Sequence, residues 1–98
     1  PLGAVKIKSV KSQSKKHQIK VIWNTKSGAS GYQIYYSRNK NFKKLAAKKT
    51  VKGGKTKSYV GKNFTKGKKY YVKVRAYKNV NGKKVYGKWS NVKSVKCK

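Results

Sequence analysis

Apolar side chains along this chain recur mainly at every second position, which is the period of a β-strand with one buried face. The clearest alternation covers residues 70–77, and shorter ones cover residues 5–11, 19–23, 32–37 and 90–97. Nowhere do the apolar positions follow the three-to-four residue spacing of a long amphipathic helix. The pattern therefore predicts short strands throughout.

Turn-forming residues separate these strands. Glycine and asparagine occur in residues 24–28, at Gly53-Gly54 and at Asn81-Gly82, and the last pair suits a tight hairpin because both residues accept positive φ. A short strand is expected over residues 56–60. Residues 42–51 are ambiguous between a helical turn capped by Asn41 and an irregular turn followed by a strand, and we favour the strand.

The last strand carries one irregularity. Val92 is out of step with Val95 and Cys97, which predicts a bulge or a local change of face. Seven short strands at regular intervals are typical of an antiparallel β-sandwich. With 98 residues the chain has room for one hydrophobic core.

The net charge of the chain is more informative about its function than any sequence motif. The chain has 29 Lys and Arg residues and no Asp or Glu, a formal charge of +29. A high charge is also typical of disorder, but 12% of the residues are aromatic and they alternate with Lys, which favours a folded domain. We expect the partner to be a polyanion.

The same composition excludes several function classes. Without carboxylates the chain cannot form a paired-carboxylate hydrolase site, a calcium cage or an acid-oriented catalytic triad. His17 and Cys97 are too few for a structural zinc site, which needs four ligands. Cys97 is expected to be a small apolar strand residue. We therefore predict no catalytic residue, no metal site and no cofactor.

The chain ends carry little information. No apolar run approaches the length of a membrane span, and no signal peptide is present. Pro1-Leu2-Gly3 is either the remnant of a cleaved tag or a native lead-in to the first strand. We interpret residues 4–98 as a single domain, which we expect to be a monomer.

Five features stand out along the chain: Trp23 at the end of the second strand, Gly31-Tyr32-Gln33-Ile34, Phe64 six positions before Tyr70, residues 70–77, and Gly87-Lys88-Trp89-Ser90. Together they resemble the fibronectin type III family, and the last of them resembles bacterial extracellular members in particular. The resemblance extends over nearly the whole chain. It implies an all-β, seven-stranded antiparallel immunoglobulin-like β-sandwich without an obligatory disulfide.

The resemblance also implies roles for individual residues. Trp23 would be the central core aromatic, and Tyr70 would place its ring in the core while its hydroxyl bonds the preceding backbone. The expected core residues are Trp23, Tyr32, Ile34, Phe64, Tyr70, Val72 and Val74.

If residues 70–76 point alternately inward, the residues between them must point outward by the pleat alone. In the family the third and sixth strands are neighbours, so their outward side chains would share one face. The candidate anion-binding face comprises Tyr35, Tyr71, Lys73, Arg75, Tyr77 and Trp89. The alternative is a purely structural ladder, in which Arg75 stacks on Trp89 through a cation–π contact.

Three functional interpretations stay open. The first is a non-catalytic spacer domain of a bacterial secreted or cell-surface protein, which binds teichoic acid, acidic or sulfated glycan or extracellular DNA through its charge. The second is a docking module for an acidic protein or an acidic neighbouring domain. The third is an engineered supercharged scaffold. Because nearly all the cations are Lys, base-specific DNA recognition is not expected.

Overall fold

The computed structural model describes residues 3–12, 17–62, 64–65 and 67–97. Pro1 and Leu2 lie outside the described residues, so the structure does not bear on the two interpretations of the lead-in. Within the described part all regular structure is extended, and no helix there is long and apolar enough to cross a membrane.

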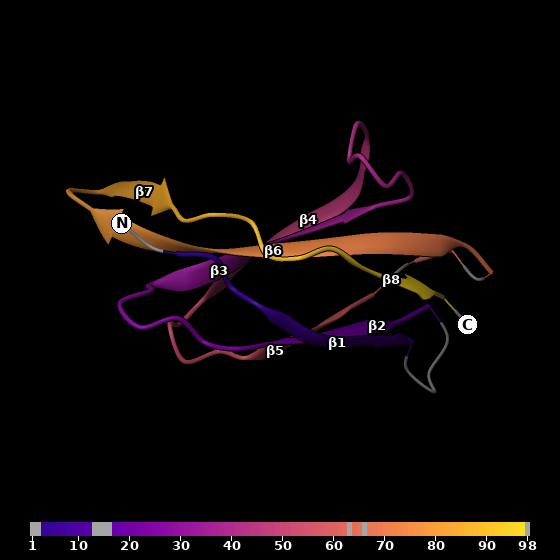
Figure 1. Ribbon diagram of the computed structural model, residues 1–98, viewed down its shortest axis with the longest axis horizontal. Helices are drawn as coiled ribbons and strands as arrows, with labels where there is room; N and C mark the ends of the chain where they lie inside the picture. The colour runs from indigo at the N-terminus through magenta and orange to yellow at the C-terminus, as the bar shows by residue number, and fades with distance from the viewer. Residues whose placement is uncertain (1–2, 13–16, 63, 66, 98) are drawn as a thin grey trace.

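Eight strands form two antiparallel sheets that pack face to face (Figure 1). The strands are β1 (Ile7–Ser12), β2 (Ile19–Trp23), β3 (Gly31–Ser37), β4 (Leu45–Lys52), β5 (Ser58–Gly61), β6 (Lys69–Val80), β7 (Lys83–Tyr86) and β8 (Lys93–Lys96). One sheet has the order β1-β2-β5, and the other has the order β4-β3-β6-β7, with β8 also paired to β6. The predicted all-β sandwich is confirmed.

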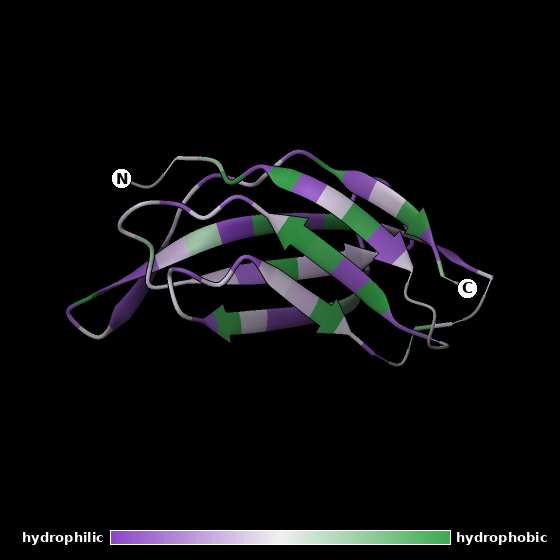
Figure 2. Cartoon of the chain, turned by 90° about the horizontal axis from the view of Figure 1, so that it is seen from below, coloured by the Kyte–Doolittle hydropathy of each residue, from purple (hydrophilic) through white to green (hydrophobic). Residues whose placement is uncertain are grey.

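The core lies between the sheets and follows from the alternation of side chains. Figure 2 shows hydrophobic and hydrophilic residues alternating along the strands. All seven residues expected in the core are buried, together with Val5, Ile7, Ile19, Val21, Tyr36, Ala76 and Cys97. Aromatic rings connect the two sheets, since the rings of Trp23 on β2 and Tyr32 on β3 have centroids 5.4 Å apart. Phe64, in the connection between β5 and β6, packs against the five-stranded sheet, with its ring centroid 4.7 Å from that of Tyr36 and 5.0 Å from that of Tyr70. Such tilted contacts add to the burial of apolar area.

Tyr70 has the geometry that the family resemblance implies. Its ring is buried, and its hydroxyl accepts a hydrogen bond from the backbone N–H of Thr65 at 2.8 Å. This bond fixes the connection between β5 and β6, which crosses from one sheet to the other. Tyr70 therefore packs in the core with its ring and stabilises the β5–β6 connection with its hydroxyl.

The additional strand arises from a long hairpin. β6 continues to Val80, beyond the expected end near residue 77, and pairs with β7 through the turn at Asn81-Gly82. Both turn residues have positive φ, 51° at Asn81 and 80° at Gly82, as a tight two-residue hairpin requires. The turn was predicted, but β7 was not, because its four residues are all exposed and carry no alternating burial.

Two further segments can be compared with the prediction, and the second of them differs from it in extent. Residues 42–51 contain an irregular turn with Phe42 at a φ of 57°, followed by β4, as favoured from the sequence. The last strand is shorter than expected and begins at Lys93, after Ser90 has bonded to the backbone of Val74. Val92 is 46% exposed and Cys97 is fully buried, consistent with the expected change of face.

Gly31 offers a direct test of the packing between β4, β3 and β6. A Cβ atom there would clash with the carbonyl oxygen of Val51 and lie 2.5 Å from the hydroxyl of Tyr77. We expect Gly31→Ala to destabilise the domain by about 2 kcal/mol, because a packed strand cannot absorb the overlap. Chemical denaturation measures the change.

Gly82→Ala is the matched control. Gly82 has positive φ, but a Cβ atom added there would meet no other atom within 4 Å, so the variant should lose only about 1 kcal/mol through turn strain. Equal losses in the two variants would contradict the packing described at Gly31.

Candidate functional site

The outer face of the five-stranded sheet brings most of the predicted binding residues together. In the register between β3 and β6, Tyr35 lies opposite Lys73, and Gln33 lies opposite Arg75. The neighbouring residues on the same strands, Ile34 among them, are fully buried, so these four side chains point away from the core.

Cations and aromatic rings alternate across this face. The guanidinium carbon of Arg75 lies 3.7 Å from the ring centroid of Tyr86 and 4.3 Å from that of Trp89. Lys73 Nζ lies 4.3 Å from the Trp89 centroid and 4.4 Å from that of Phe42. We call the five residues Tyr86, Arg75, Trp89, Lys73 and Phe42 the cation–aromatic ladder. Their contacts confirm the expected stacking of Arg75 on Trp89.

A loop and a hairpin position the two outer rings of the ladder. Phe42 adopts left-handed φ, which is uncommon for an aromatic residue, and its N–H donates to the carbonyl of Asn39 at 3.1 Å. This conformation turns the loop between β3 and β4 so that the ring reaches Lys73 on β6. Tyr86 reaches Arg75 because β7 pairs along the extended end of β6.

The centre of the ladder is held by hydrogen bonds. Gln33 Oε1 accepts a hydrogen bond from Arg75 Nε at 2.8 Å, which fixes the guanidinium plane. Ser90 exchanges two hydrogen bonds with the backbone of Val74, both at 2.8 Å, and so holds the adjacent Trp89 against the sheet. Tyr35 also packs against Trp89, with ring centroids 4.5 Å apart.

The ladder is also the place where a lysine is electrostatically perturbed. Partial burial, with Arg75 adding a smaller effect, lowers the pKa of Lys73 below its ordinary value. Both causes disfavour the charged form. The rings oppose them, because each cation–π contact stabilises a cation by about 0.5–1 kcal/mol at an exposed site.

Two members of the predicted face behave differently. Tyr71 points outward and is half-buried, with Lys69 Nζ 5.3 Å from its ring centroid. Tyr77 was expected to be exposed, and that prediction is wrong, since only 2% of it is exposed. Gly31 lies opposite it on β3 and leaves room for the ring, and Tyr86 packs against it with centroids 6.3 Å apart. Tyr77 therefore supports the face from within but is not accessible to a ligand.

Phe42 and Tyr86 are the ladder residues that the sequence interpretation missed. Phe42 lies in a loop, and its left-handed backbone leaves no periodic signal. Tyr86 could have been found from the Asn81-Gly82 turn, because a two-residue hairpin places Tyr86 directly opposite Tyr77.

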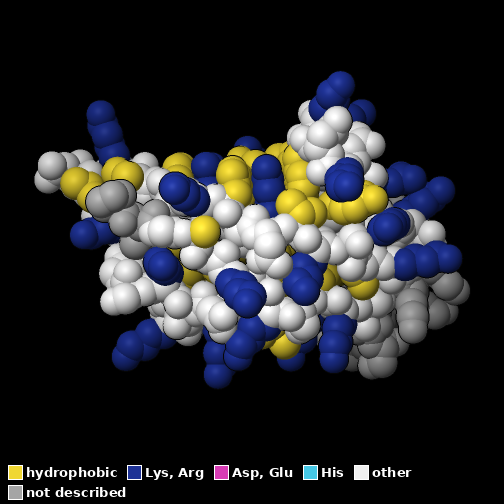
Figure 3. All heavy atoms as spheres, in the orientation of Figure 1, with side chains coloured by type: hydrophobic (Ala, Val, Ile, Leu, Met, Phe, Trp, Pro, Cys, Tyr) yellow, Lys and Arg dark blue, Asp and Glu magenta, His cyan; other side chains and the backbone are white. Residues whose placement is uncertain are grey.

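The arrangement limits what this face can bind. The rings of Trp89, Tyr86 and Phe42 are already in contact with the protein's own cations, which leaves less ring surface for stacking on bases or sugars. What the face offers to a ligand is positive charge. Figure 3 shows Lys and Arg side chains across the whole visible surface, with hydrophobic side chains gathered at its upper margin.

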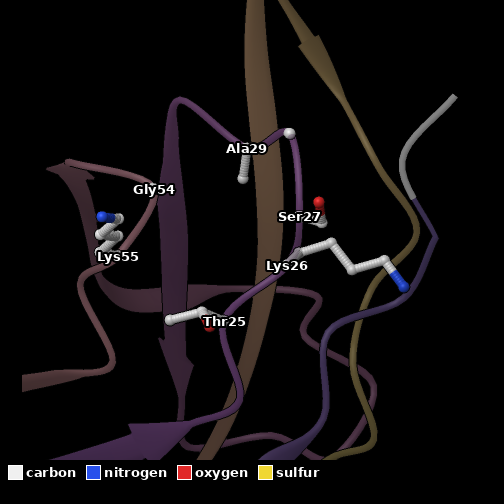
Figure 4. Close-up of a pocket in the computed structure, with 7 residues that line it drawn as sticks. Thr25, Lys26, Ser27, Ala29, Gly54 and Lys55 are labelled. Atoms are coloured by element: carbon white, nitrogen blue, oxygen red, sulfur yellow. The ribbon is translucent and has the colours of Figure 1, made fainter.

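A hollow of about 610 Å³ lies between the β2–β3 and β4–β5 loops. The Tyr32 hydroxyl ties these loops together by accepting from the N–H of Lys26 and donating to the carbonyl of Gly54, both at 2.7 Å. Figure 4 shows the side chains of Lys26 and Lys55 on opposite sides of the view, so the two cations do not converge on one ligand.

The few residues of the described part that could bind a metal ion or act as a nucleophile do not lie together. The described residues contain no cluster of three or more His, Cys, Asp or Glu residues. Cys97 is fully buried, and Nδ1 of His17 lies 2.8 Å from the carbonyl oxygen of Phe64. Burial, with a smaller effect of Tyr59, raises the pKa of the Tyr36 phenol well above its ordinary value, so this buried hydroxyl stays neutral.

Comparison with solved structures gives the fold relatives. The chain is similar to a Fn3-like protein from Clostridium thermocellum, at 21% identity and a TM-score of 0.72, over 98% of this chain and 91% of that chain. It is similar to the FN1–FN3 domains of chicken CNTN1, at 22% identity and a TM-score of 0.78, over 99% of this chain and 31% of that chain.

A third similar structure is a beta-1,2-glucanase from Parabacteroides distasonis, at 21% identity and a TM-score of 0.74, over 98% of this chain and 12% of that chain. The chain thus spans nearly all of the first structure, and under a third of the other two. No family model and no curated protein sequence matches the chain. Identities this low show a shared fold, and the chain has a fibronectin type III-like fold.

Proposed function

We propose that this chain is a non-catalytic accessory domain of a bacterial extracellular protein, and that its lysine-rich surface binds anionic polymers without sequence specificity. The observation that carries the proposal is a folded sandwich with 29 cationic side chains and no Asp or Glu to compensate them. Like charges at this density repel one another in the compact state. A polyanion would relieve that repulsion and release its own counterions.

Two features support a polymer over a small ligand. The cations come from both sheets and the loops, and Figure 3 shows them scattered over the face that it draws. Lysine is also a point charge, without the fork of donors by which Arg recognises a single phosphate or base. Teichoic acid, acidic or sulfated glycan and extracellular DNA all present the required repeated charge.

The accessory role is supported by the fold relatives. A Fn3-like protein from Clostridium thermocellum has nearly the length of this chain, and a domain of the same fold forms 12% of a beta-1,2-glucanase chain from Parabacteroides distasonis. By analogy we infer that this domain accompanies other domains at a bacterial surface.

A binding panel tests the proposal. Heparin, duplex DNA and purified wall teichoic acid should all bind, and affinity for DNA should fall about 10³-fold or more between about 50 and 200 mM NaCl if six or more phosphates are contacted. Isothermal titration calorimetry at the two salt concentrations measures this. Tight, salt-independent binding of one polymer alone would refute non-specific polyanion binding.

A pair of neighbouring variants distinguishes charge from ring stacking. Lys69→Gln should weaken DNA binding and lower the slope of log affinity against log salt by about 1, because it removes one phosphate contact. Tyr71→Ser should leave the affinity within about twofold, since stacking on an accessible ring would otherwise contribute about 1–3 kcal/mol per base. If Tyr71→Ser has the larger effect, the aromatic platform is real and diffuse charge is not the explanation.

A further inference from the structure

The sandwich leaves one long strand edge open in the part of the chain that the structure describes. β4 pairs only with β3 and has eight residues. The edge strands β5 and β7 have only four residues each. β1 lies beside β8, and the N–H of Ile7 donates to Asn91 Oδ1 at 3.0 Å, so that edge is partly covered.

The register shows which backbone groups of β4 are open. The N–H of Gly53 donates to the carbonyl of Ser30 at 2.9 Å, and Gly31 lies opposite Lys52. Gly31 and Lys52 therefore form a non-hydrogen-bonded pair, and the alternation of an antiparallel ladder turns the N–H and C=O groups of Lys48 and Thr50 away from β3. The carbonyl of Lys52 is already bonded by the hydroxyl of Thr56 at 3.1 Å.

The exposed side chains of β4 determine which kind of strand can pair with its open edge. Lys48 and Lys52 share the outer face of the sheet, and Lys49 points to the opposite face, yet all three are exposed. A strand added to β4 would therefore place side chains beside lysines on both of its faces. Lysines on edge strands prevent pairing between identical sheets. In this chain the effect is strong, because a second copy also carries a charge of +29.

We propose that β4 receives an extended acidic segment of a partner protein as an additional strand. The open N–H and C=O groups of Lys48 and Thr50 supply the main-chain hydrogen bonds, and Lys48, Lys49 and Lys52 pair with carboxylates on the two faces of the added strand. Main-chain bonds of this kind give affinity, and side chains give selectivity. The inference goes beyond polymer binding, because it requires a peptide backbone of defined geometry.

Two peptides of equal charge test the proposal. One is a capped decapeptide built on the repeat Glu-Glu-Val-Val, which presents carboxylates on both faces of a strand, and the other has Pro in place of each Val. We expect the Glu-Val peptide to bind at least about tenfold more tightly, since in either register Pro removes every second N–H that could be donated to β4. Fluorescence anisotropy gives the affinities. Equal affinities, or no binding of the Glu-Val peptide, would overturn the proposal.

Amide hydrogen exchange locates the added strand. Saturating Glu-Val peptide should slow exchange at the N–H groups of Lys48 and Thr50 and leave the edge residues of β5 and β7 unchanged. Protection spread over other lysine-rich segments, without protection at these two amides, would show that the peptide binds by charge alone and would overturn the proposal.

A proline variant separates this edge from the polymer-binding surface. Thr50→Pro removes an outward N–H while the bonds between β3 and β4 remain, and Thr50→Val is the control that keeps the donor. The proline variant should lose at least about tenfold in affinity for the Glu-Val peptide, and its binding of heparin should be unchanged. If the proline variant does not fold, the exchange pattern of the unmodified domain decides. If neither the unmodified domain nor the two Thr50 variants bound heparin, the proposed function would be refuted, but this inference would not.

Discussion

The structure depends on inward-facing side chains that hold two sheets together against the repulsion of a cationic shell. The buried residues are mostly apolar or aromatic, and most of them come from β2, β3 and β6. No carboxylate side chain can compensate a lysine, so the attraction that maintains the fold is hydrophobic burial, aromatic packing and backbone hydrogen bonding. Interactions with salt and with anions outside the chain then act on a domain that is already strained electrostatically.

Within the chain, the cation–aromatic ladder takes over part of the role that acidic residues have in other proteins. Arg75 and Lys73 lie next to each other on one face, where they repel, and both lie against Trp89. The rings attract the cations through their quadrupoles, and Gln33 orients the guanidinium without adding charge. The same contacts make the face less suitable for stacking on a ligand. Structural and binding roles therefore compete for the same rings, and the geometry favours the structural one.

The sequence predicted the parts of the fold that depend on local alternation. The strands that form the centre of each sheet and the core positions Trp23, Tyr70 and Val72 follow from the two-residue period, because a one-residue slip would expose them. The stacking of Arg75 on Trp89 was also predicted, as part of the structural-ladder alternative for the outer face. The accessibility of Tyr77 was not, because it depends on the missing side chain of Gly31 on a strand more than forty residues away in the chain. The left-handed backbone of Phe42 likewise follows from tertiary contacts.

The balance between core and shell is tested most directly by the thermal midpoint of unfolding as a function of ionic strength. Raising NaCl from about 10 to about 100 mM shortens the screening length from about 30 to about 10 Å, which weakens repulsion between exposed lysines and leaves core packing unchanged. The midpoint, followed by the far-ultraviolet signal of the sheets, should rise steadily over this range. A midpoint that stays constant or falls would contradict the account.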